Sequence, residues 1–434
     1  PDSAAVSCWA AARTARTSSA WDVCVWCWRH VTLMAAHGLP EWSNAQAATD
    51  CRPAVTRPIS SDQRRCRSAL SSRLLSLSRV INNKNSLPIL SCFLFQVKDN
   101  VLTITASDSE NVMKTTIELT EHDGDGEFAV QSQTILDAVK ELPEQPLTLN
   151  VNLDEHVIYL TYQNGSYHFP VQSAEEYPRE QEMGEDASKF ALDAQVLSSA
   201  ISRSLFAAAQ DELRPVMNGI YFDLKPDCLS IVATDGHKLV RNNILSLQSE
   251  TPASFILPRK PATLLKGVLP QTEGEVTIEF DSKQATIRFA EGYLACRLIE
   301  GRYPNYNGVI PQTNPNVVTI DRKSFVGAIR RVLPFSSNSS QLVCFHFENG
   351  NLELRAEDID FATNAVENVV CSYSGTPISI GFKGSSMLEV VNNLESGDIT
   401  IQLADPSRPG IIIPVDQPEN QEVLMLIMPM LLND

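Results

Sequence analysis

The chain has 434 residues and is acidic, with 35 Lys and Arg against 52 Asp and Glu and a net charge of −17. This length corresponds to about two to four domains, and the negative charge disfavours indiscriminate binding to nucleic acid. The longest apolar run, 423–432, contains Pro429 and is far shorter than the roughly 20 residues of a membrane-spanning helix. We interpret it as a buried strand. Because no secretory signal is visible either, we expect a soluble, cytoplasmic protein.

Residues 1–66 differ in composition from the rest of the chain. They hold all five Trp and five of the ten Cys but only one of the 19 Gly, and they show no sustained period of 2 or 3.6 residues. A C-x-x-C pair begins at Cys24 and is followed by His30, but Cys51 and Cys66 are too widely spaced to complete a zinc site easily. We therefore expect no metal and no cofactor. We interpret the segment as a disordered extension, a tag or a translated non-coding stretch.

The other five cysteines are Cys92, Cys228, Cys296, Cys344 and Cys371. Each stands alone in an apolar, strand-like stretch. We therefore predict reduced core residues and not disulfide partners.

A threefold internal repeat organises the rest of the chain. Three stretches each consist of a short apolar strand, a small residue, an acidic turn and a second strand, and they are anchored by Asp108, Asp235 and Asp358. The anchors lie about 125 residues apart, and self-similarity at a fixed period indicates repeated structural units. We predict three units with the boundaries 67–187, 188–315 and 316–434.

One amphipathic helix is predicted before each acidic turn and a second one after it. Apolar residues recur at i, i+3, i+4 and i+7, as on a helix with one buried face. The leading helices are expected over 68–81, 194–209 and 323–334, and the second helices over 133–143, 260–270 and 385–395. Alternating strands after each second helix predict hairpins. Each unit is then two helices packed on roughly eight short strands, which is an α+β arrangement.

Asp235 stands two residues before His237, and an acid beside a histidine invites a catalytic interpretation. The repeat argues against it, because the aspartate recurs in all three units and the histidine occurs in one. A carboxylate that accepts hydrogen bonds from nearby backbone N–H groups explains the recurrence better. A hydrolase would also need a nucleophile and an oxyanion hole, and no G-x-S-x-G motif occurs. We predict a turn role and keep the hydrolase as an alternative.

Basic residues cluster on predicted helices, although residues 67–434 carry 28 Lys and Arg against 47 Asp and Glu. Windows without any acid cover all three leading helices and the second helix of the middle unit. Solvated helix faces are the plain alternative, but their recurrence predicts a surface that contacts phosphates without reading sequence. A protein scaffold without any role on DNA is a further alternative. The residues expected to face DNA are Arg73, Arg79, Lys84, Arg203, Lys266, Arg330 and Arg331.

Four short motifs occur in order along the chain: LPIL at 87–90, ATDGHKL at 233–239, GRYPNY at 301–306 and MPM at 428–430. Together with the repeats, they make the chain resemble the bacterial DNA polymerase III beta subunits, the replication sliding clamps, over about residues 67–432. The resemblance implies three topologically similar clamp domains and a head-to-tail homodimer that closes a ring around duplex DNA. The helices would line the hole of this ring.

A clamp of this kind is a non-catalytic processivity factor without cofactors and without contact to a membrane. The resemblance implies that short peptide motifs of the polymerase III alpha subunit, the clamp loader and repair polymerases bind to it. Ring closure pairs strand edges between subunits. The dimer contact is expected to run from Phe169 and Val171 to Leu333 and Phe335.

The resemblance also implies a peptide pocket between the second unit, the third unit and the C-terminal tail. The residues that match its lining are Arg214, Met217, Thr234, Gly236, His237, Lys238, Leu239, Pro304, Val309, Leu426, Ile427, Met428, Pro429, Met430 and Leu432. Methionines make an adaptable groove, and Gly236 permits close backbone approach. For the two methionines, plain core is the alternative.

Some positions depart from the family pattern. Residues 61–70 are polar where the family begins with a strand, so the first unit is expected to lack an edge strand, or the upstream sequence to be out of frame. Lys238 stands where Arg is common, Gly308 near a usual basic residue, and Ser386 near a usual aromatic one. The polar rim of the pocket is therefore expected to differ from the family, while its apolar floor is intact.

Overall fold

The computed structural model describes residues 66–82, 87–178, 183–184, 187–211 and 213–432. The N-terminal segment with its C-x-x-C pair, the polar stretch before residue 66 and Lys84 lie outside these ranges. Among the described helices, none has the length and apolar character needed to cross a membrane. The five cysteines from Cys92 onward are free thiols, and all but Cys344 are buried.

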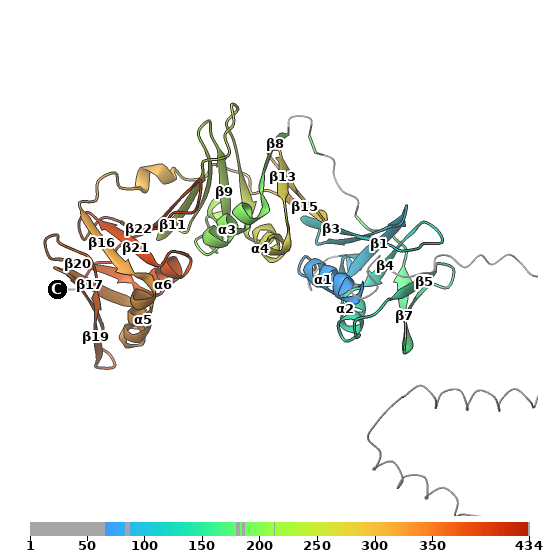
Figure 1. The fold of residues 1–434 in the computed structure, drawn as a ribbon, viewed down its shortest axis with the longest axis horizontal. Helices are drawn as coiled ribbons and strands as arrows, with labels where there is room; N and C mark the ends of the chain where they lie inside the picture. The colour runs from blue at the N-terminus through green and yellow to red at the C-terminus, as the bar shows by residue number, and fades with distance from the viewer. Residues whose placement is uncertain (1–65, 83–86, 179–182, 185–186, 212, 433–434) are drawn as a thin grey trace, which may run out of the picture. The chain divides into compact units, whose positions relative to one another are not determined.

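Each repeat unit, called domain 1, 2 or 3 below, contributes a pair of helices and a set of short strands (Figure 1). Domain 1 comprises α1 (Cys66–Ser78), η1 (Pro88–Ser91), β1 (Cys92–Lys98), β2 (Val101–Ser107), β3 (Asn111–Glu118), β4 (Gly126–Gln131), α2 (Ser132–Lys140), β5 (Thr148–Asn152), β6 (Val157–Tyr162) and β7 (Gly165–Gln172). Domain 2 comprises β8 (Ser188–Asp193), α3 (Ala194–Leu205), η2 (Pro215–Met217), β9 (Gly219–Leu224), β10 (Leu229–Thr234), β11 (Lys238–Ile244), β12 (Ala253–Pro258), α4 (Arg259–Val268), η3 (Leu269–Gln271), β13 (Glu275–Phe280), β14 (Gln284–Phe289) and β15 (Gly292–Arg297). After η4 (Tyr306–Val309), domain 3 comprises β16 (Asn316–Asp321), α5 (Arg322–Val332), η5 (Leu333–Phe335), β17 (Leu342–Glu348), β18 (Asn351–Asp358), β19 (Thr363–Val370), β20 (Ile378–Lys383), α6 (Gly384–Asn392), β21 (Asp398–Leu403), β22 (Gly410–Pro414) and β23 (Gln421–Ile427).

The six predicted helices are all present, and each ends a few residues before the predicted end. In α4 and α5 the apolar pattern continues into η3 and η5, where Pro270 and Pro334 stand. Proline lacks the N–H that an α-helix needs, so the chain tightens into a 3₁₀ turn while its apolar side chains stay on the core. The prediction of an α+β fold is confirmed.

Two of the three sheets continue across domain boundaries. The order is β5-β6-β7-β4-β1-β2-β3-β15-β14-β13-β8 in the 11-stranded sheet, β12-β9-β10-β11-β23-β22-β21-β16 in the 8-stranded sheet and β19-β18-β17-β20 in the 4-stranded sheet. We call the antiparallel β3/β15 pair the first seam, since it joins domains 1 and 2. The β11/β23 pair is the second seam, which joins domains 2 and 3.

The helices pack on one side of each sheet, which we call the helix face. In the 11-stranded sheet, α1 contacts β2 and β3, and α4 contacts β15. Met113 and Leu294 lie opposite each other in the first seam and belong to this core. Because side chains alternate along a strand, the neighbouring pair Val112 and Ala295 points to the other side, the open face.

The three repeated aspartates cap their own turns. The Oδ1 atom of Asp108 accepts hydrogen bonds from the N–H groups of Glu110 at 3.0 Å and Asn111 at 2.7 Å. The same atom of Asp235 accepts from the N–H groups of His237 at 2.8 Å and Lys238 at 2.9 Å. That of Asp358 accepts from the N–H groups of Asp360 at 3.0 Å and Phe361 at 3.2 Å. The predicted turn role is confirmed.

The first seam needs a residue without a side chain at its start. A Cβ atom on Gly292 would overlap the carbonyl oxygen of Lys114 and would lie 2.9 Å from the Cα atom of Thr115. These are backbone atoms of the partner strand, which cannot move without opening the ladder. We therefore expect Gly292→Ala to lower the free energy of unfolding by about 3 kcal/mol, measured by denaturant unfolding.

Gly397→Ala is the matched control, since a Cβ atom there would meet nothing within 4 Å. Equal losses in the two variants would show that close approach across the seam is not the cause.

Candidate functional site

The second seam brings the predicted turn and tail together. Lys238 lies opposite Ile427, and Leu239 lies opposite Leu426. One step beyond the ladder, the N–H of Met428 donates to the carbonyl oxygen of His237 at 2.8 Å. The ATDGHKL turn and the first part of the tail are therefore neighbours, as the prediction required.

An apolar cluster on the open face of the 8-stranded sheet lies beside this contact. It consists of Val232, Leu239, Ile256, Tyr303, Tyr306, Ile310, Ile411 and Leu426. We call it the docking floor. Its tyrosines come from the linker between domains 2 and 3, and the ring of Tyr303 stacks on Tyr221 with centroids 4.6 Å apart.

The linker residues that were predicted, Pro304 and Val309, are exposed, and Val309 keeps 51% of its surface. The prediction missed the buried anchors Tyr303 and Tyr306 that hold the linker in place. The signal for them was the aromatic pair within GRYPNY. Tyr306 also donates a hydrogen bond to Asp223 at 2.7 Å.

Arg214 and Met217 form the edge of the site at Gly236. A Cβ atom on Gly236, whose φ is +90°, would lie 2.9 Å from Nη1 of Arg214 and 3.9 Å from Cε of Met217. Arg214 pairs with Asp211 at 3.0 Å and keeps 45% of its side chain exposed. Thr234 stabilises the turn, since its hydroxyl donates a hydrogen bond to the carbonyl of Lys238 at 2.7 Å.

The tail residues divide into core and surface. Leu426 and Ile427 are almost fully buried, whereas Met428 is 38% exposed. Pro429 is partly exposed. The last two predicted residues lie beside β20 of domain 3. The N–H of Met430 donates to the carbonyl of Gly381 at 2.8 Å, and a Cβ atom on Gly381 would lie 2.9 Å from Leu432.

Lys238 ties domain 2 to domain 3. Its ammonium lies 2.9 Å from Asp235 and 3.0 Å from Glu389 on α6, and 11% of its side chain is exposed. Burial by itself would lower the pKa of Lys238, but the two carboxylates outweigh it and raise the pKa above its usual value. This side chain is therefore engaged in the domain junction.

The carboxylate of Asp235 is fully occupied by structural contacts. Its Oδ1 atom caps the turn, and its Oδ2 atom accepts from Lys238. Burial by itself would raise the pKa of Asp235, but hydrogen bonds from Lys238 and from the N–H of His237 outweigh it and hold the pKa below its usual value. A carboxylate held ionised by backbone N–H groups and an ammonium is a poor general base.

The predicted DNA-facing arginines are partly engaged elsewhere. Arg203 must be corrected, because it is 5% exposed and binds Gln421 at 3.1 Å and Glu395 at 3.2 Å, both in domain 3. A guanidinium so enclosed cannot reach a phosphate. Arg73 pairs with Glu291 across the first seam, and Arg331 grips Glu367 with two hydrogen bonds at 2.8 and 2.9 Å.

Other basic residues in the acid-free windows connect the two helices of a domain. Arg67, near the start of α1, donates to the carbonyl of Leu142 at 2.5 Å, just after α2. Arg322, at the start of α5, donates to Ser396 at 2.9 Å, just after α6. Arg67 also donates to the carbonyl of Lys140, the last residue of α2, at 3.1 Å, and the last carbonyls of a helix lack intrahelical partners. Each of these cations therefore joins the two helices of its domain. Acid-free windows thus arise partly from packing.

Four of the predicted residues are exposed: Arg79, which directly follows α1, Lys266 on α4, and Arg330 and Arg331 on α5. Of these, Arg331 is paired with Glu367. Arg79 lies against Gly267, so it adjoins Lys266 on the neighbouring helix. Arg330 approaches Asn392 at 3.4 Å.

The predicted dimer residues lie near two strands with unpaired edges. Phe169 and Val171 point into the core of domain 1 from β7 and are 6% and 5% exposed. Only the last two residues of β7 pair with β4. β19 ends the 4-stranded sheet, since only β18 pairs with it among the described residues. In η5, Leu333 is partly exposed and Phe335 is 40% exposed.

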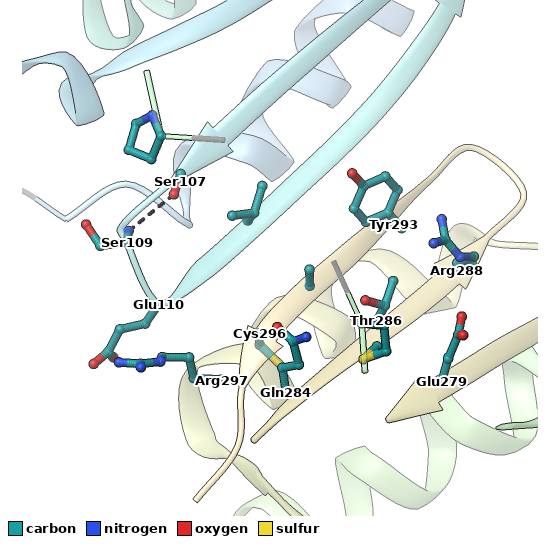
Figure 2. A pocket seen from close by; sticks show the side chains of 14 residues that line it. Ser107, Ser109, Glu110, Glu279, Gln284, Thr286, Arg288, Tyr293, Cys296 and Arg297 are labelled. Atoms are coloured by element: carbon teal, nitrogen blue, oxygen red, sulfur yellow. Dashed lines mark hydrogen bonds between the residues drawn. The ribbon is translucent and has the colours of Figure 1, made fainter. Parts of the chain in front are cut away.

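A cavity that the sequence did not predict lies on the open face at the first seam. It measures about 550 Å³, and Figure 2 shows Glu110 beside Arg297 at its edge. The N–H of Arg297 donates to the carbonyl of Glu110 at 2.9 Å, as Met428 donates to His237 in the second seam. The two seams therefore share one backbone arrangement, which joins Glu110 and Arg297 at the first seam and His237 and Met428 at the second.

The contacts of Asp235 predict a pH dependence. Because its pKa is lower in the folded than in the unfolded protein, its carboxylate stabilises the fold above the unfolded pKa of about 4, and this contribution is lost as the pH falls through the folded pKa. We expect Asp235→Asn to lower the free energy of unfolding at pH 7 by about 1–3 kcal/mol. The loss should shrink toward pH 3, as measured by urea unfolding at both pH values.

Asp227→Asn, at an exposed aspartate of the same domain, is the control and should change little at either pH. A loss from Asp235→Asn that is equal at pH 7 and pH 3 would contradict the assignment.

Three family models match the chain one after another. They are the N-terminal domain of the DNA polymerase III beta subunit over residues 65–181, its central domain over 191–305 and its C-terminal domain over 307–431. Together they span most of the chain.

Curated relatives and solved structures agree with these matches. The beta sliding clamp of Caulobacter vibrioides is 27% identical over 83% of this chain and 97% of its own length, and that of Pseudomonas aeruginosa is 26% identical over 84% and 98%. The crystal structure of the DNA polymerase III beta subunit from Thermotoga maritima is 26% identical and superposes with a TM-score of 0.78 over 87% of this chain and all of that one. A Bartonella birtlesii sliding clamp bound to griselimycin is 25% identical, with a TM-score of 0.78 over the same shares. The chain belongs to the DNA polymerase III beta subunit family, the bacterial beta sliding clamps.

Proposed function

We propose that this chain acts as the non-catalytic processivity clamp of a replicative polymerase and that the residues above divide this work between two faces. The chain is a DNA sliding clamp, and two copies form a ring that encircles duplex DNA and tethers partner proteins. The observation that carries the division is the continuous sheet at each seam. The helices pack on one side of these sheets, and the docking floor lies on the other side at the second seam.

Encirclement explains how an acidic chain works on DNA. A protein with a net charge of −17 gains little from general electrostatic attraction to phosphates. A closed ring needs no tight contact, because the duplex cannot leave it sideways. A few exposed cations such as Arg79, Lys266 and Arg330 give weak, sequence-independent contacts, which permit movement along the duplex.

The docking floor suits short peptides with apolar side chains. Leu426 and the buried linker tyrosines supply a fixed apolar base, and the exposed thioether of Met428 can adapt to different side chains. His237 and Arg214 at the rim offer polar atoms that can orient a peptide. Lys238 contributes indirectly, because it holds the turn against α6.

Ring closure follows from the repeat. β7 is the last strand of domain 1, as β15 and β23 are the last strands of domains 2 and 3. β19 follows the third aspartate turn, as β3 and β11 follow the first two. Since β15 pairs with β3 and β23 with β11, the corresponding pair is β7 of one copy with β19 of another. This pairing would also cover part of Phe335 and Tyr167, which are 40% and 37% exposed.

The helix-face cations can be tested by charge removal. We expect the triple variant Arg79→Gln, Lys266→Gln, Arg330→Gln to leave a preloaded DNA circle several times faster than the wild-type ring at 50 mM salt. The salt dependence of its retention should also be shallower. Retention is measured by gel filtration of loaded, nicked circles.

The triple variant Lys98→Gln, Lys189→Gln, Lys283→Gln removes the same charge from exposed positions on strands and turns. If this control loses DNA equally fast, net charge and not the helix face governs retention. If neither variant nor wild type is retained on circles, the protein is a scaffold without a role on DNA.

The site formed by the docking floor and by Met428 beside it can be tested with a peptide. We expect Met428→Ala to weaken binding of a fluorescent peptide copied from the clamp-binding segment of the cognate polymerase alpha subunit by about 10-fold. Fluorescence anisotropy measures the dissociation constant. Val415→Ala removes a similarly exposed apolar side chain just after β22, at the end of that strand away from its pairing with Ile427, and should bind like the wild type. Unchanged binding by Met428→Ala would place the peptide elsewhere.

A further inference from the structure

The free edge of β7 carries a proline at a position where a strand partner would need a hydrogen-bond donor. The N–H of Val171 donates to the carbonyl of His156 at 2.9 Å, toward β6. Successive N–H positions point to opposite edges of a strand. The nitrogen of Pro170 therefore points away from β6, and it carries no hydrogen. On this edge β4 pairs with the next two residues, Val171 and Gln172, so the part of the edge that ends at Pro170 is left for a further strand.

Both internal seams have a donor at the corresponding position. In β15 the N–H of Leu298 donates to Lys283 at 2.7 Å, as Val171 does to His156 in β7. The preceding residue, Arg297, thus corresponds to Pro170, and its N–H closes the first seam by donating to Glu110 at 2.9 Å. In the second seam, Met428 does the same with His237.

The opposite strand supplies a matching acceptor. Asn111 and Lys238 are the first residues of β3 and β11, and each lies opposite the aspartate of its own turn. In domain 3 the residue opposite Asp358 is Thr363, because this turn is longer. Ala362, with a φ of +49°, then stands where Glu110 and His237 stand in the other turns, and its carbonyl would face Pro170 of a second copy.

The turn at this edge also lacks the lysine that ties each internal seam. In the first seam, Lys260 on α4 contacts Asp108 at 2.5 Å. In the second, Lys238 contacts Asp235. For a β7/β19 pair, Gln133 corresponds to Lys260, because each is the second residue of its helix, α2 or α4. Thr363 corresponds to Lys238, because each is the first residue of its strand, β19 or β11. Neither side chain carries a charge, so Asp358 gains no cation from them.

We infer that the β7/β19 seam between two copies is built weaker than the two internal seams. It ends one hydrogen bond earlier, at Pro170, and it has no lysine beside the aspartate of its turn. Three seams with the same strand arrangement thus differ in strength by sequence. This inference rests on the proposed ring and adds two residues, Pro170 and Thr363, that set the strength of the contact between its copies.

Pro170→Ala tests the missing hydrogen bond, because alanine restores the N–H and fits the same extended backbone. We expect the dissociation constant of the dimer to fall about 3- to 10-fold, with a similar slowing of subunit exchange. Exchange is followed by mixing two fluorescently labelled populations of the full chain and recording energy transfer. Thr363→Lys tests the missing ion pair independently and should also slow exchange.

Pro146→Ala is the matched control, since it removes an exposed proline of domain 1 that lies outside β7 and so reports the general effect of added backbone freedom. The inference of a weak seam would be wrong if Pro170→Ala exchanged subunits at least as fast as the wild type and Thr363→Lys also left the rate unchanged. The assignment as a clamp would still stand. A wild-type chain that is monomeric at micromolar concentration would instead overturn the ring itself. If Pro170→Ala misfolds, Thr363→Lys decides between the outcomes.

Discussion

The structure depends on backbone hydrogen bonds that cross domain boundaries. In most multidomain proteins a flexible linker joins separate cores, and the interface between domains is modest. Here β3 with β15 and β11 with β23 make ladders of the same kind as those inside each domain. Each domain is thereby held in a fixed register with the next. That register places all helix pairs on one side of the sheets and leaves the other side free of helices.

Ion pairs and caps then adapt the repeated frame to each junction. Lys260 and Lys238 tie the first two aspartate turns to the following domain. Arg203 joins α3 to domain 3. These cations lie partly within the protein, where replacing one partner leaves a costly unpaired charge. Part of the positive charge near the helices therefore serves architecture.

Much of this fold could be predicted from sequence because it is repeated. The period of the repeat and the spacing of apolar residues were enough to predict six helices and their order. The three equivalent aspartates were enough to predict the turn role of Asp235. The ends of the helices were predicted less well, since 3₁₀ turns carry the same apolar spacing. The role of Arg203 could not be predicted, because a count of charges does not show which guanidinium is enclosed. Tyr303 and Tyr306 were missed because a linker gives no periodic signal.

The linker between domains 2 and 3 couples peptide binding to the contact between these domains. Its two tyrosines are part of the docking floor, next to strands from both domains. A bound peptide would therefore rest on the connection between two domains as well as on each of them. Binding and the freedom of that joint are then thermodynamically linked, so a peptide that prefers one arrangement of the joint also stabilises that arrangement.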